Sequence, residues 1–371
     1  MSGYPALVRF FSISQSIAIH VQHLLNLDFD GTRRTMRIAI IGAGAMGTLL
    51  GHGLCRARYD VSMMDLPNRI KQIQDSGGLT VVTPEGIEST VCPSAATTDF
   101  ASVGIHDIVF LATKSQDLPA LAPQISKLAD KTSTVVTIQN GFPWWYLQNF
   151  TSAVQSSRIE CLDPKRILER SIEASQIVGC VAYPAALMEP TGRVCHIEGY
   201  RMPVGELDGS SRQRTRQLAS ALCEAGFKSR IIDDIRSEIW LKAWGAIPIN
   251  PISALTRATM AEICTFPLTR DLVRQMMFEV QAVAEALGAT FRHTVEKRID
   301  GAQAVGDHKT SMLQDVESRR ELEVDALLLS VIELAAMVGK DVPTVKTIYA
   351  CTALLNKNLL LNHGQKPSQT K

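Results

Sequence analysis

A short glycine-rich segment, Gly42-Ala43-Gly44-Ala45-Met46-Gly47, constrains the fold of this chain more than any other feature. It follows the apolar run Arg37–Ile41 and precedes a helix-like stretch from Thr48 to about Arg58. In this setting the first glycine allows a tight turn, the second lets the backbone approach a pyrophosphate, and the third permits close packing of the helix on the strand. The helix N-terminus would stabilise the phosphate charge. We therefore expect a dinucleotide-binding loop, with a purely structural turn as the alternative.

A second predicted strand, Asp60–Met64, is followed by Asp65, which lies 18 residues beyond the last glycine of the loop. In dinucleotide-binding folds an acid about 20 residues on accepts hydrogen bonds from the ribose of adenosine. A carboxylate there repels a 2′-phosphate, the next residue is Leu66, and the nearest cations are Arg69 and Lys71. The pattern favours NADH over NADPH, unless Asp65 serves only as a helix cap or a turn residue.

Short β-branched runs alternate with helix-like stretches from Met36 to about Glu206. The runs are Arg37–Ile41, Val61–Met64, Asp107–Ala112, Ser133–Ile138 and Gln176–Ala182. This alternation predicts an α/β fold with a Rossmann-type, doubly wound parallel sheet. After about Asp233 the runs vanish and apolar residues recur with the helical period, so we expect an all-helical C-terminal domain.

The length of 371 residues is sufficient for two domains. We divide the chain into an N-terminal extension (1–35), a Rossmann dinucleotide-binding domain (36–233), a helical substrate and dimerisation domain (234–360) and a tail (361–371). The extension has Arg9, Phe10 and Phe11 and no acid before Asp28, which faintly resembles a mitochondrial presequence. A flexible extension or an upstream start codon is the interpretation we favour.

The balance of positive and negative charges argues against polyanionic partners. The chain has 38 Lys and Arg against 37 Asp and Glu, a net charge of +1, so no bulk electrostatic attraction to nucleic acid or to an anionic membrane is expected. The eight cysteines form no Cys-x-x-Cys pair, no His cluster has metal-ligand spacing, and no run of about 18 apolar residues occurs. The composition indicates a reduced, cytoplasmic protein without a metal or a membrane span.

Several further segments carry a resemblance to a known family. They are Leu111-Ala112-Thr113-Lys114, Ile138-Gln139-Asn140-Gly141, Glu238–Lys242, Ile249–Thr256, Ser311–Asp315 and Glu323. In order and spacing, from Met36 to about Leu355, the chain resembles ketopantoate reductase, also called 2-dehydropantoate 2-reductase. The resemblance implies hydride transfer from a nicotinamide, NADPH in the family, to the ketone of 2-dehydropantoate. The product would be (R)-pantoate, for pantothenate and coenzyme A synthesis.

Lys242 matches the catalytic lysine of the family. Reduction of a ketone creates alkoxide charge on its oxygen, and an ammonium beside that oxygen can stabilise and protonate it. Burial readily lowers the pKa of a lysine, and Lys242 stands between Leu241 and Ala243 in an otherwise apolar helix. The alternative is a lysine that extends from an amphipathic helix into solvent.

Two polar residues follow predicted strands at the carboxyl edge of the sheet, where ligands of doubly wound folds bind. Asn140 matches the family residue that touches both cofactor and substrate, and Lys114 matches one that contacts the cofactor. Ala185 aligns with a small cofactor-side position. Without the resemblance, Lys114 and Asn140 would be interpreted as ordinary loop residues.

One position on the predicted helix departs from the family pattern. Lys242, Ala246 and Asn250 are spaced by four and lie on one face, within about 80° of arc. The family commonly presents Lys, Asn and Asn there. Asn250 can bind a substrate hydroxyl or carboxylate, but Ala246 can do neither. A flatter or more apolar 2-oxo acid is therefore conceivable.

Ser311, with Gln314 three residues later, has the form of a helix capping box. The same geometry aims backbone N–H groups at an anion, which is how the family holds the substrate carboxylate. Glu323 would be roughly 18 Å from Ser311 along a straight helix, so we expect it to contact the nicotinamide end of the cofactor or to orient Lys242, unless the helix breaks. His308 is assigned no role.

Three functions remain open from the sequence. The first is ketopantoate reductase in the strict sense. The second is an NAD-dependent D-2-hydroxy-acid dehydrogenase similar to the D-mandelate dehydrogenases of this fold, which Asp65, Leu66 and Ala246 favour. The third is a non-catalytic nucleotide sensor, against which the presence of Lys242 argues. The expected partner is a small 2-oxo acid, and a homodimer through the helical domain stays open.

Overall fold

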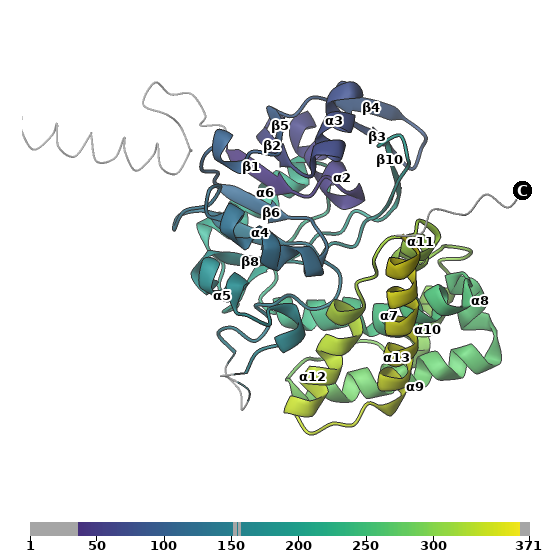
Figure 1. The fold of residues 1–371 in the computed structure, drawn as a ribbon. Coiled ribbons are helices and arrows are strands. Elements are labelled where there is room, and N and C mark those ends of the chain that lie inside the picture. Colours follow the sequence, from purple (N-terminus) through teal and green to yellow (C-terminus); the bar gives the residue numbers. More distant parts are fainter. Residues whose placement is uncertain (1–35, 151–153, 155–156, 364–371) are drawn as a thin grey trace, which may run out of the picture.

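The computed structural model describes residues 36–150, 154 and 157–363. The expectations for residues 1–35 and for residues 364–371 of the tail lie outside the described residues. The described chain forms a sheet-containing domain, drawn in purple to teal, and a helical domain, drawn in green to yellow, which meet along one side of each (Figure 1).

The main sheet has seven strands in the order β11-β8-β7-β6-β1-β2-β5. Their bounds are β1 Arg37–Ile41, β2 Asp60–Met64, β5 Ala95–Thr97, β6 Ile108–Leu111, β7 Thr134–Thr137, β8 Ile177–Cys180 and β11 Val204–Glu206. Every neighbouring pair is parallel except β11 with β8. The chain runs outward from β1 to β2 on one side and to β6 on the other, so the carboxyl end of β1 lies at the switch point of a doubly wound fold. The predicted fold class is confirmed.

Alternate residues of β1 explain why helices cover both faces of this sheet. Ile38 and Ile40 belong to one buried cluster, whereas Ala39 and Ile41 belong to another, because successive side chains of a strand point to opposite faces. The covering helices are α2 Ala45–Arg56, α3 Pro67–Asp75, α4 Leu118–Ile125, α5 Ile167–Ser171 and α6 Gln213–Glu224, with short 3-10 helices η1 Phe100–Ser102, η2 Ser115–Asp117, η3 Glu160–Leu162 and η4 Ala174–Gln176.

A second sheet of four strands, in the order β4-β3-β10-β9, is an element that the sequence pattern did not reveal. Its strands are β3 Leu79–Val82, β4 Glu88–Val91, β9 Ala185–Met188 and β10 Val194–Glu198. They are short, and β4 and β9 contain no fully buried residue, so they lack the strong apolar signal of the central strands.

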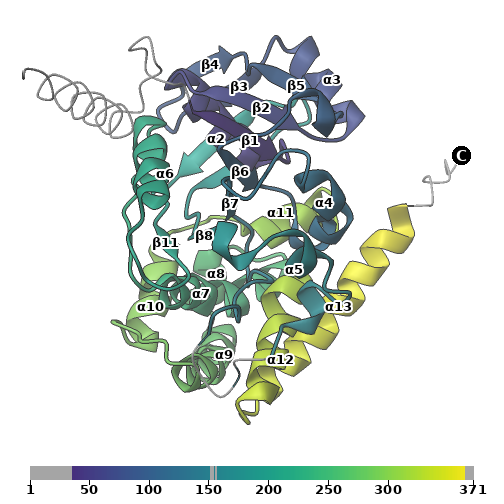
Figure 2. The same cartoon turned by 90° about the vertical axis from the view of Figure 1, so that its left-hand side faces the viewer.

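The helical domain is built around α7, Ile235–Thr256. The other elements are α8 Met260–Thr265, α9 Pro267–Ala286, α10 Val295–Gln303, α11 Ser311–Glu317, the π-helix η5 Asp325–Leu329, α12 Ser330–Met337 and α13 Pro343–His363. Helix α7 contacts α9, α11 and α13, and α13 forms an outer edge of the domain (Figure 2). Because α7 also packs under the sheet through Ile235 and Ile239, it connects the cores of the two domains.

One local expectation about α11, the capping box at Ser311, was wrong. The N-cap is Thr310, whose Oγ1 accepts the Leu313 N–H at 3.2 Å, whereas Ser311 is the exposed first residue of the helix. The Gln314 side chain donates instead to the Lys309 carbonyl, so Ser311 and Gln314 do not form a capping box. The helix ends at Glu317, so the straight-helix separation between Ser311 and Glu323 does not apply.

At the C-terminus, α13 continues to His363, which is three residues into the expected tail.

Within residues 36–150, 154 and 157–363, no helix is long and apolar enough to span a membrane.

Candidate active site

The glycine loop has the geometry that its spacing predicts. Gly42 has φ +101°, and a Cβ there would be 2.7 Å from the Thr113 nitrogen. A Cβ on Gly47 would be 1.8 Å from the Gly42 carbonyl oxygen, so the close packing of α2 on β1 needs this glycine. Gly44 differs, because nothing lies within 4 Å of its virtual Cβ. A side chain at this position would therefore fill open space above the loop without striking the protein.

The N-terminus of α2 lies at the same place. Its N-cap, Gly44, provides no side-chain hydrogen bond, and the first intrahelical bond runs from Thr48 N to Gly44 O. The N–H groups of the first turn are thus left for another acceptor, and the helix dipole favours a negative one. Open space above Gly44 together with these donors fits the pyrophosphate of a dinucleotide.

Asp65 lies beside this loop, at the carboxyl end of β2. Its Oδ2 accepts the Ala43 N–H at 2.5 Å, and its Oδ1 accepts the Leu66 N–H at 2.6 Å. An ionised carboxylate has about four acceptor sites, so capacity remains for ribose hydroxyls. Leu66 is 69% exposed and brings no charge.

Arg69 is the cation nearest to Asp65 in sequence, and its guanidinium is engaged in packing. It donates to the carbonyl of Ala43, to Thr48 Oγ1, to Gln72 Oε1 and to the Gly192 carbonyl. These bonds fasten α3 to the underside of the glycine loop. Arg69 is therefore poorly placed to receive a 2′-phosphate.

Lys242, on α7, reaches across to the carboxyl edge of the sheet. Its Nζ donates to Asn140 Oδ1 at 2.8 Å and to the Ala182 carbonyl at 2.5 Å. Burial lowers the pKa of Lys242 to about 8, while Glu323 and then Cys180 act in the opposite direction. The ammonium is thus held in a defined position with a weakened hold on its proton.

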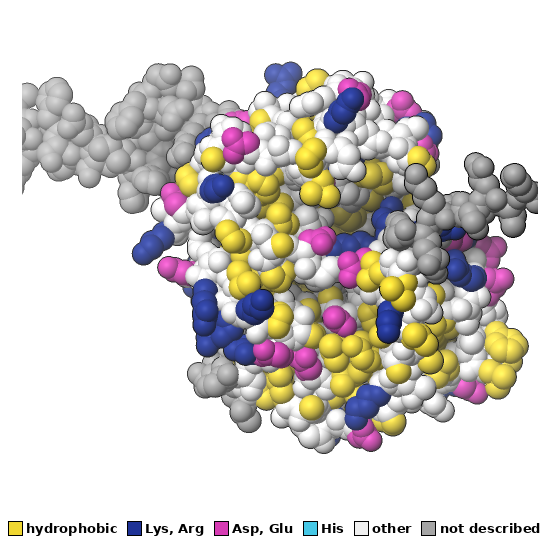
Figure 3. Space-filling view, in the orientation of Figure 1, with side chains coloured by type: hydrophobic (Ala, Val, Ile, Leu, Met, Phe, Trp, Pro, Cys, Tyr) yellow, Lys and Arg dark blue, Asp and Glu magenta, His cyan; other side chains and the backbone are white. Residues whose placement is uncertain are grey.

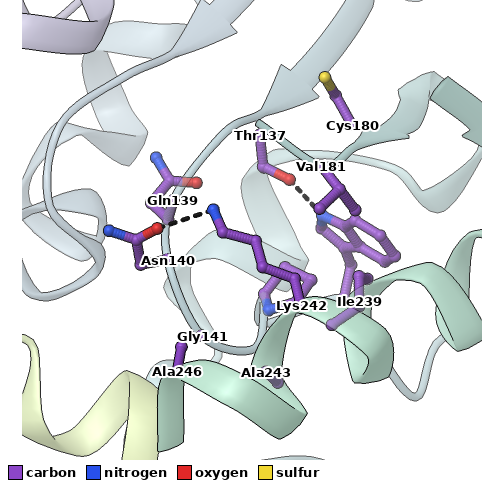
Figure 4. A pocket seen from close by; sticks show the side chains of 12 residues that line it. Thr137, Gln139, Asn140, Gly141, Cys180, Val181, Ile239, Lys242, Ala243 and Ala246 are labelled. Atoms are coloured by element: carbon purple, nitrogen blue, oxygen red, sulfur yellow. Dashed lines mark hydrogen bonds between the residues drawn. The ribbon is translucent and has the colours of Figure 1, made fainter. Parts of the chain in front are cut away.

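Asn140 points toward Lys242 (Figure 4) and has hydrogen bonds to both Lys242 and Glu323. Its carbonyl oxygen accepts from Lys242, and its side chain also hydrogen-bonds Glu323. Glu323 accepts the Ser115 N–H at 3.3 Å as well. Burial raises the pKa of Glu323, whereas Lys114 and these hydrogen bonds lower it. The cation on one side and the carboxylate on the other fix which way the amide of Asn140 points.

The loop after Asn140 is fastened to the helical domain. Gly141 has φ +78°, and a Cβ there would be 2.1 Å from the Ala326 carbonyl oxygen in η5. Phe142 N–H donates to the same oxygen at 3.0 Å. This glycine is required both for its backbone conformation and for the close approach of two chain segments.

Lys114, at the end of β6, connects the two domains. Its Nζ donates to Asp315 Oδ2 at 2.8 Å and to the Glu321 carbonyl. The ion pair is partly buried, with 28% and 13% of the two side chains exposed. Lys and Arg side chains, beside acidic ones, are visible in the hollow between the domains (Figure 3).

A cavity lies beside Lys242, lined by Asn140, Ala246 and apolar side chains such as Trp145, Val181 and Ile239. The structure thus brings Lys242, Asn140 and Glu323 together. Ala246 lines the same cavity as Lys242 and Asn140 (Figure 4).

The remaining predicted residues lie farther along their elements. Asn250 is half-buried two turns beyond Lys242 on α7, Ala185 is half-buried at the start of β9, and Ser311 is exposed at the start of α11. No hydrogen bond links these three side chains to Lys242 among the described residues.

The sequence missed two contributions to this site. The Ala182 carbonyl is a partner of Lys242 that no side-chain motif marks. Gln139 Nε2 donates to the carbonyls of Leu111 and Thr113, which ties the carboxyl ends of β6 and β7 together beneath the site. The role of Gln139 could have been suspected, because it directly precedes Asn140 in the same motif. In the sequence analysis, a role was assigned to Asn140 alone.

The arrangement suits stabilisation of negative charge on a small ligand. An ammonium of lowered pKa can donate a hydrogen bond and a proton to an oxygen that becomes negatively charged. Among the described residues, no group of three or more His, Cys, Asp or Glu side chains could hold a metal ion.

Comparison with known proteins identifies relatives over the same residues. The family model described as "Ketopantoate reductase PanE/ApbA" matches residues 38–209, and "Ketopantoate reductase PanE/ApbA C terminal" matches residues 234–356. A 2-dehydropantoate 2-reductase of Mesorhizobium japonicum is 40% identical over 316 residues, which are 85% of this chain and 96% of the relative.

Solved structures agree with these matches. A crystal structure described as that of a ketopantoate reductase from Ralstonia solanacearum has a TM-score of 0.82 and 31% identity, and covers 87% of this chain and 98% of that chain. A D-mandelate dehydrogenase with NADH and anilino(oxo)acetate shares the fold, with a TM-score of 0.75, 22% identity and coverage of 88% and 100%. Both halves of the chain and both domains of its fold therefore match, and the chain belongs to the ketopantoate reductase family.

Proposed function

We propose that this protein reduces 2-dehydropantoate to (R)-pantoate with a nicotinamide cofactor. The observation that carries the proposal is Lys242, which projects from the helical domain to Asn140 at the carboxyl edge of the dinucleotide-binding sheet. The relative from Mesorhizobium japonicum, which bears the name of this activity, supports the same conclusion.

In this proposal each residue has a defined task. A nicotinamide bound at the glycine loop would supply a hydride to the ketone carbon. Lys242 donates a hydrogen bond and then a proton to the ketone oxygen, which becomes the hydroxyl of the product, and the neutral amine regains a proton from solvent. Asn140 positions Lys242 and the ligands. The negative charge of Glu323 raises the pKa of Lys242 and so favours its ammonium form.

The remaining predicted site residues complete the proposal. The loop from Gly42 to Gly47 and Asp65 would bind the dinucleotide, with Lys114 and Ala185 on the cofactor side. Asn250 and Ser311 are the further substrate-binding candidates. We propose NADH as the preferred cofactor, because Asp65 would oppose a 2′-phosphate and the Arg69 guanidinium already has four protein partners.

A second candidate is a D-2-hydroxy-acid dehydrogenase that acts on a substrate without the pantoate hydroxyl. Ala246 favours it, because the cavity beside Lys242 presents a methyl group where the family commonly presents an amide. A non-catalytic nucleotide sensor is disfavoured, since it would have no need for an enclosed lysine whose pKa is lowered.

Steady-state kinetics with both nicotinamides decides among these functions. The substrates are 2-dehydropantoate, 3-methyl-2-oxobutanoate, which lacks the hydroxyl, and benzoylformate. Strict ketopantoate reductase activity predicts the highest kcat/KM for 2-dehydropantoate. A higher value for either of the other acids supports the second function, and no turnover with any of them supports the sensor.

We also propose that two copies pair through the helical domain and that the protein acts in the cytoplasm. Phe266 and Leu268, at the start of α9, are 55% and 72% exposed. The fold is shared with a dimeric ketopantoate reductase from Staphylococcus aureus. Sedimentation equilibrium tests the pairing, and a Leu268→Asp variant should shift a dimer toward monomer.

A further inference from the structure

The segment that carries Glu323 has no regular structure of its own. Residues 318–323 connect α11 to η5 and are neither helix nor strand. The side chain of Glu323 is nevertheless fixed at the site, where it accepts the Ser115 N–H and hydrogen-bonds Asn140. The position of this carboxylate therefore depends on what holds the chain on either side of it.

Helix α13 contacts the chain on both sides of Glu323. Before it, the Leu322 N–H donates to Asn356 Oδ1 at 2.8 Å. After it, the Tyr349 hydroxyl is 3.3 Å from Asp325 Oδ1, to which it donates. Tyr349 and Asn356 are seven residues apart, about two helical turns, so they lie on one face of α13. One face of this helix thus holds both ends of the short stretch that contains Glu323.

The bond from Leu322 is the more important of the two. Leu322 is 2% exposed, and a buried backbone N–H without a partner is costly, so Asn356 satisfies a donor that has little access to solvent. Asp325 is exposed, so water can replace its contact with Tyr349. We therefore expect Asn356 to be the main anchor that α13 provides.

Apolar packing alone does not fix this segment. A cavity of about 180 Å³ lies against it, and its lining includes Leu322, Val324, Asn356 and Ser115. A cavity of this size has room for several water molecules. The backbone before Glu323 consequently has space to move into if the hydrogen bond to Asn356 is lost.

Movement of Glu323 would change the environment of Lys242. Asn140 connects the two residues, because its Oδ1 accepts from Lys242 Nζ at 2.8 Å and its side chain also hydrogen-bonds Glu323. The titratable groups that act on Glu323 or on Lys242 from the surrounding elements are Lys114 at the end of β6, Asp315 in α11 and Cys180 in β8. Glu323 raises the pKa of Lys242 more than Cys180 does.

We propose that Asn356 is a positioning residue for Glu323 and, through Glu323 and Asn140, for the ammonium of Lys242. The assignment rests on the proposed function, in which Lys242 donates the proton. Asn356 lines the cavity against Leu322 and not the one beside Lys242, so it acts through its neighbours. It gives α13, at the outer edge of the helical domain, a part in the chemistry (Figure 2).

The test uses the full chain and four variants. Asn356→Leu keeps the volume of the side chain but removes the acceptor, and Asn356→Asp keeps an acceptor oxygen. Asn358→Leu, at an exposed position two residues later on the same helix, is the matched control. Glu323→Gln shows the effect of complete loss of the carboxylate charge. Thermal unfolding of each variant separates a change at the site from a folding defect.

The first measurement is the pH dependence of kcat/KM for ketone reduction, which needs the ammonium form of Lys242. A displaced Glu323 raises the pKa of Lys242 less, so in Asn356→Leu the reduction rate should fall at a lower pH than in the wild-type protein. The shift should have the direction seen in Glu323→Gln but be smaller, and kcat should fall at least about threefold. Asn356→Asp and Asn358→Leu should show neither effect.

The second measurement needs no substrate. Cyanate carbamylates the neutral amine of a lysine, so its reaction with Lys242 at different pH values, followed by mass spectrometry, reports the pKa of that amine. Exposed Lys131 in the same sample is the internal reference. At pH 7, Asn356→Leu should increase the carbamylation of Lys242 at least about twofold, and Asn358→Leu should leave it unchanged.

A residue with a structural role alone would change the melting temperature and leave both measurements as they are. A pH profile of Asn356→Leu that matches the wild-type profile therefore overturns the proposal, and so does an equal shift in Asn358→Leu. If Asn356→Leu does not fold, Asn356→Ala, in which water can reach the Leu322 N–H, decides by the same measurements.

The two proposals fail in different ways. Wild-type protein that reduces no 2-oxo acid refutes the proposed function, and carbamylation of Lys242 then decides alone whether Asn356 acts on this lysine. Turnover with a pH profile that is insensitive to Asn356 leaves the proposed function intact and refutes the positioning role.

Discussion

Lys242 of the helical domain and Asn140 of the sheet domain share a hydrogen bond of 2.8 Å from Nζ to Oδ1. Neither domain contains this arrangement alone. The sheet supplies the dinucleotide loop and the amide, and α7 supplies the ammonium. Catalysis in this protein is therefore expected to depend on how the two domains are held together.

Replacement of the lysine tests its assignment directly. Lys242→Met removes the proton donor but preserves the bulk of the side chain, so kcat should fall by about 10²–10⁴ while cofactor affinity stays within about threefold. Stopped-flow kinetics and titration of cofactor fluorescence measure the two effects. Lys131→Met, at an exposed lysine, is the control. Retention of most of the wild-type kcat by Lys242→Met would remove this residue from the mechanism.

The lowered pKa of Lys242 predicts opposite pH profiles for the two reaction directions. Ketone reduction needs the ammonium form, so its kcat/KM should fall as pH rises through about 8. Oxidation of the hydroxy acid needs the neutral amine, so it should increase over the same range. Glu323 raises the pKa of Lys242. In Glu323→Gln, the fall of the reduction rate and the rise of the oxidation rate should therefore both occur at lower pH. If these two transitions occur at the same pH in Glu323→Gln as in the wild-type protein, a group other than Lys242 controls the pH profile.

The glycines of the loop should respond differently to alanine. At Gly44 a Cβ meets no protein atom, so Gly44→Ala should raise KM for the cofactor at least about tenfold without loss of thermal stability. At Gly47 a Cβ would strike the Gly42 carbonyl, so Gly47→Ala should lower the melting temperature by several degrees. Calorimetry and cofactor kinetics separate the two effects. Equal loss of stability in both variants would argue against a pyrophosphate site at Gly44.

Cofactor selectivity should depend on Asp65 and Leu66. Asp65→Ser together with Leu66→Arg removes the repulsive carboxylate and adds a cation at an exposed position. We expect the ratio of kcat/KM for NADPH to that for NADH to increase about 100-fold. Leu66→Gln alone is the control. A wild-type protein that already prefers NADPH strongly would contradict the proposed choice of cofactor.

Ala246→Asn should restore recognition of a substrate hydroxyl. The added amide projects into the cavity beside Lys242, so kcat/KM for 2-dehydropantoate should rise at least about tenfold relative to 3-methyl-2-oxobutanoate. Ala246→Leu, which adds similar volume without polar atoms, should give no such gain. An equal response to both acids would mean that the substrate hydroxyl lies elsewhere.

Sequence patterns predicted those parts of the fold that depend on local residues. The strand Arg37–Ile41 has the expected bounds, because a buried central strand is a continuous apolar run. The small second sheet was missed because its half-buried strands gain stability from their neighbours rather than from their own apolar content. The capping box predicted at Ser311 was wrong because Thr310, which can also cap a helix, precedes it and takes the N-cap position.

In the candidate site, too, local sequence patterns predicted some features, whereas contacts between distant residues could not be predicted. The motifs around Lys242, Asn140 and Glu323 predicted residues that the fold brings together. The pairing of Lys114 with Asp315 and the hydrogen bond from Leu322 to Asn356 join positions far apart in the chain, so no local pattern reports them.

The contact between Gly141 and Ala326 sets a condition for engineering within this family. The peptide that bears Asn140 is encoded with the sheet domain, yet its backbone is bonded to η5, just after Glu323. A chimaera that exchanged the C-terminal half at the domain boundary would give the Asn140 loop a foreign docking surface. Functional hybrids should therefore require residues 140–142 and 323–326 to come from the same parent.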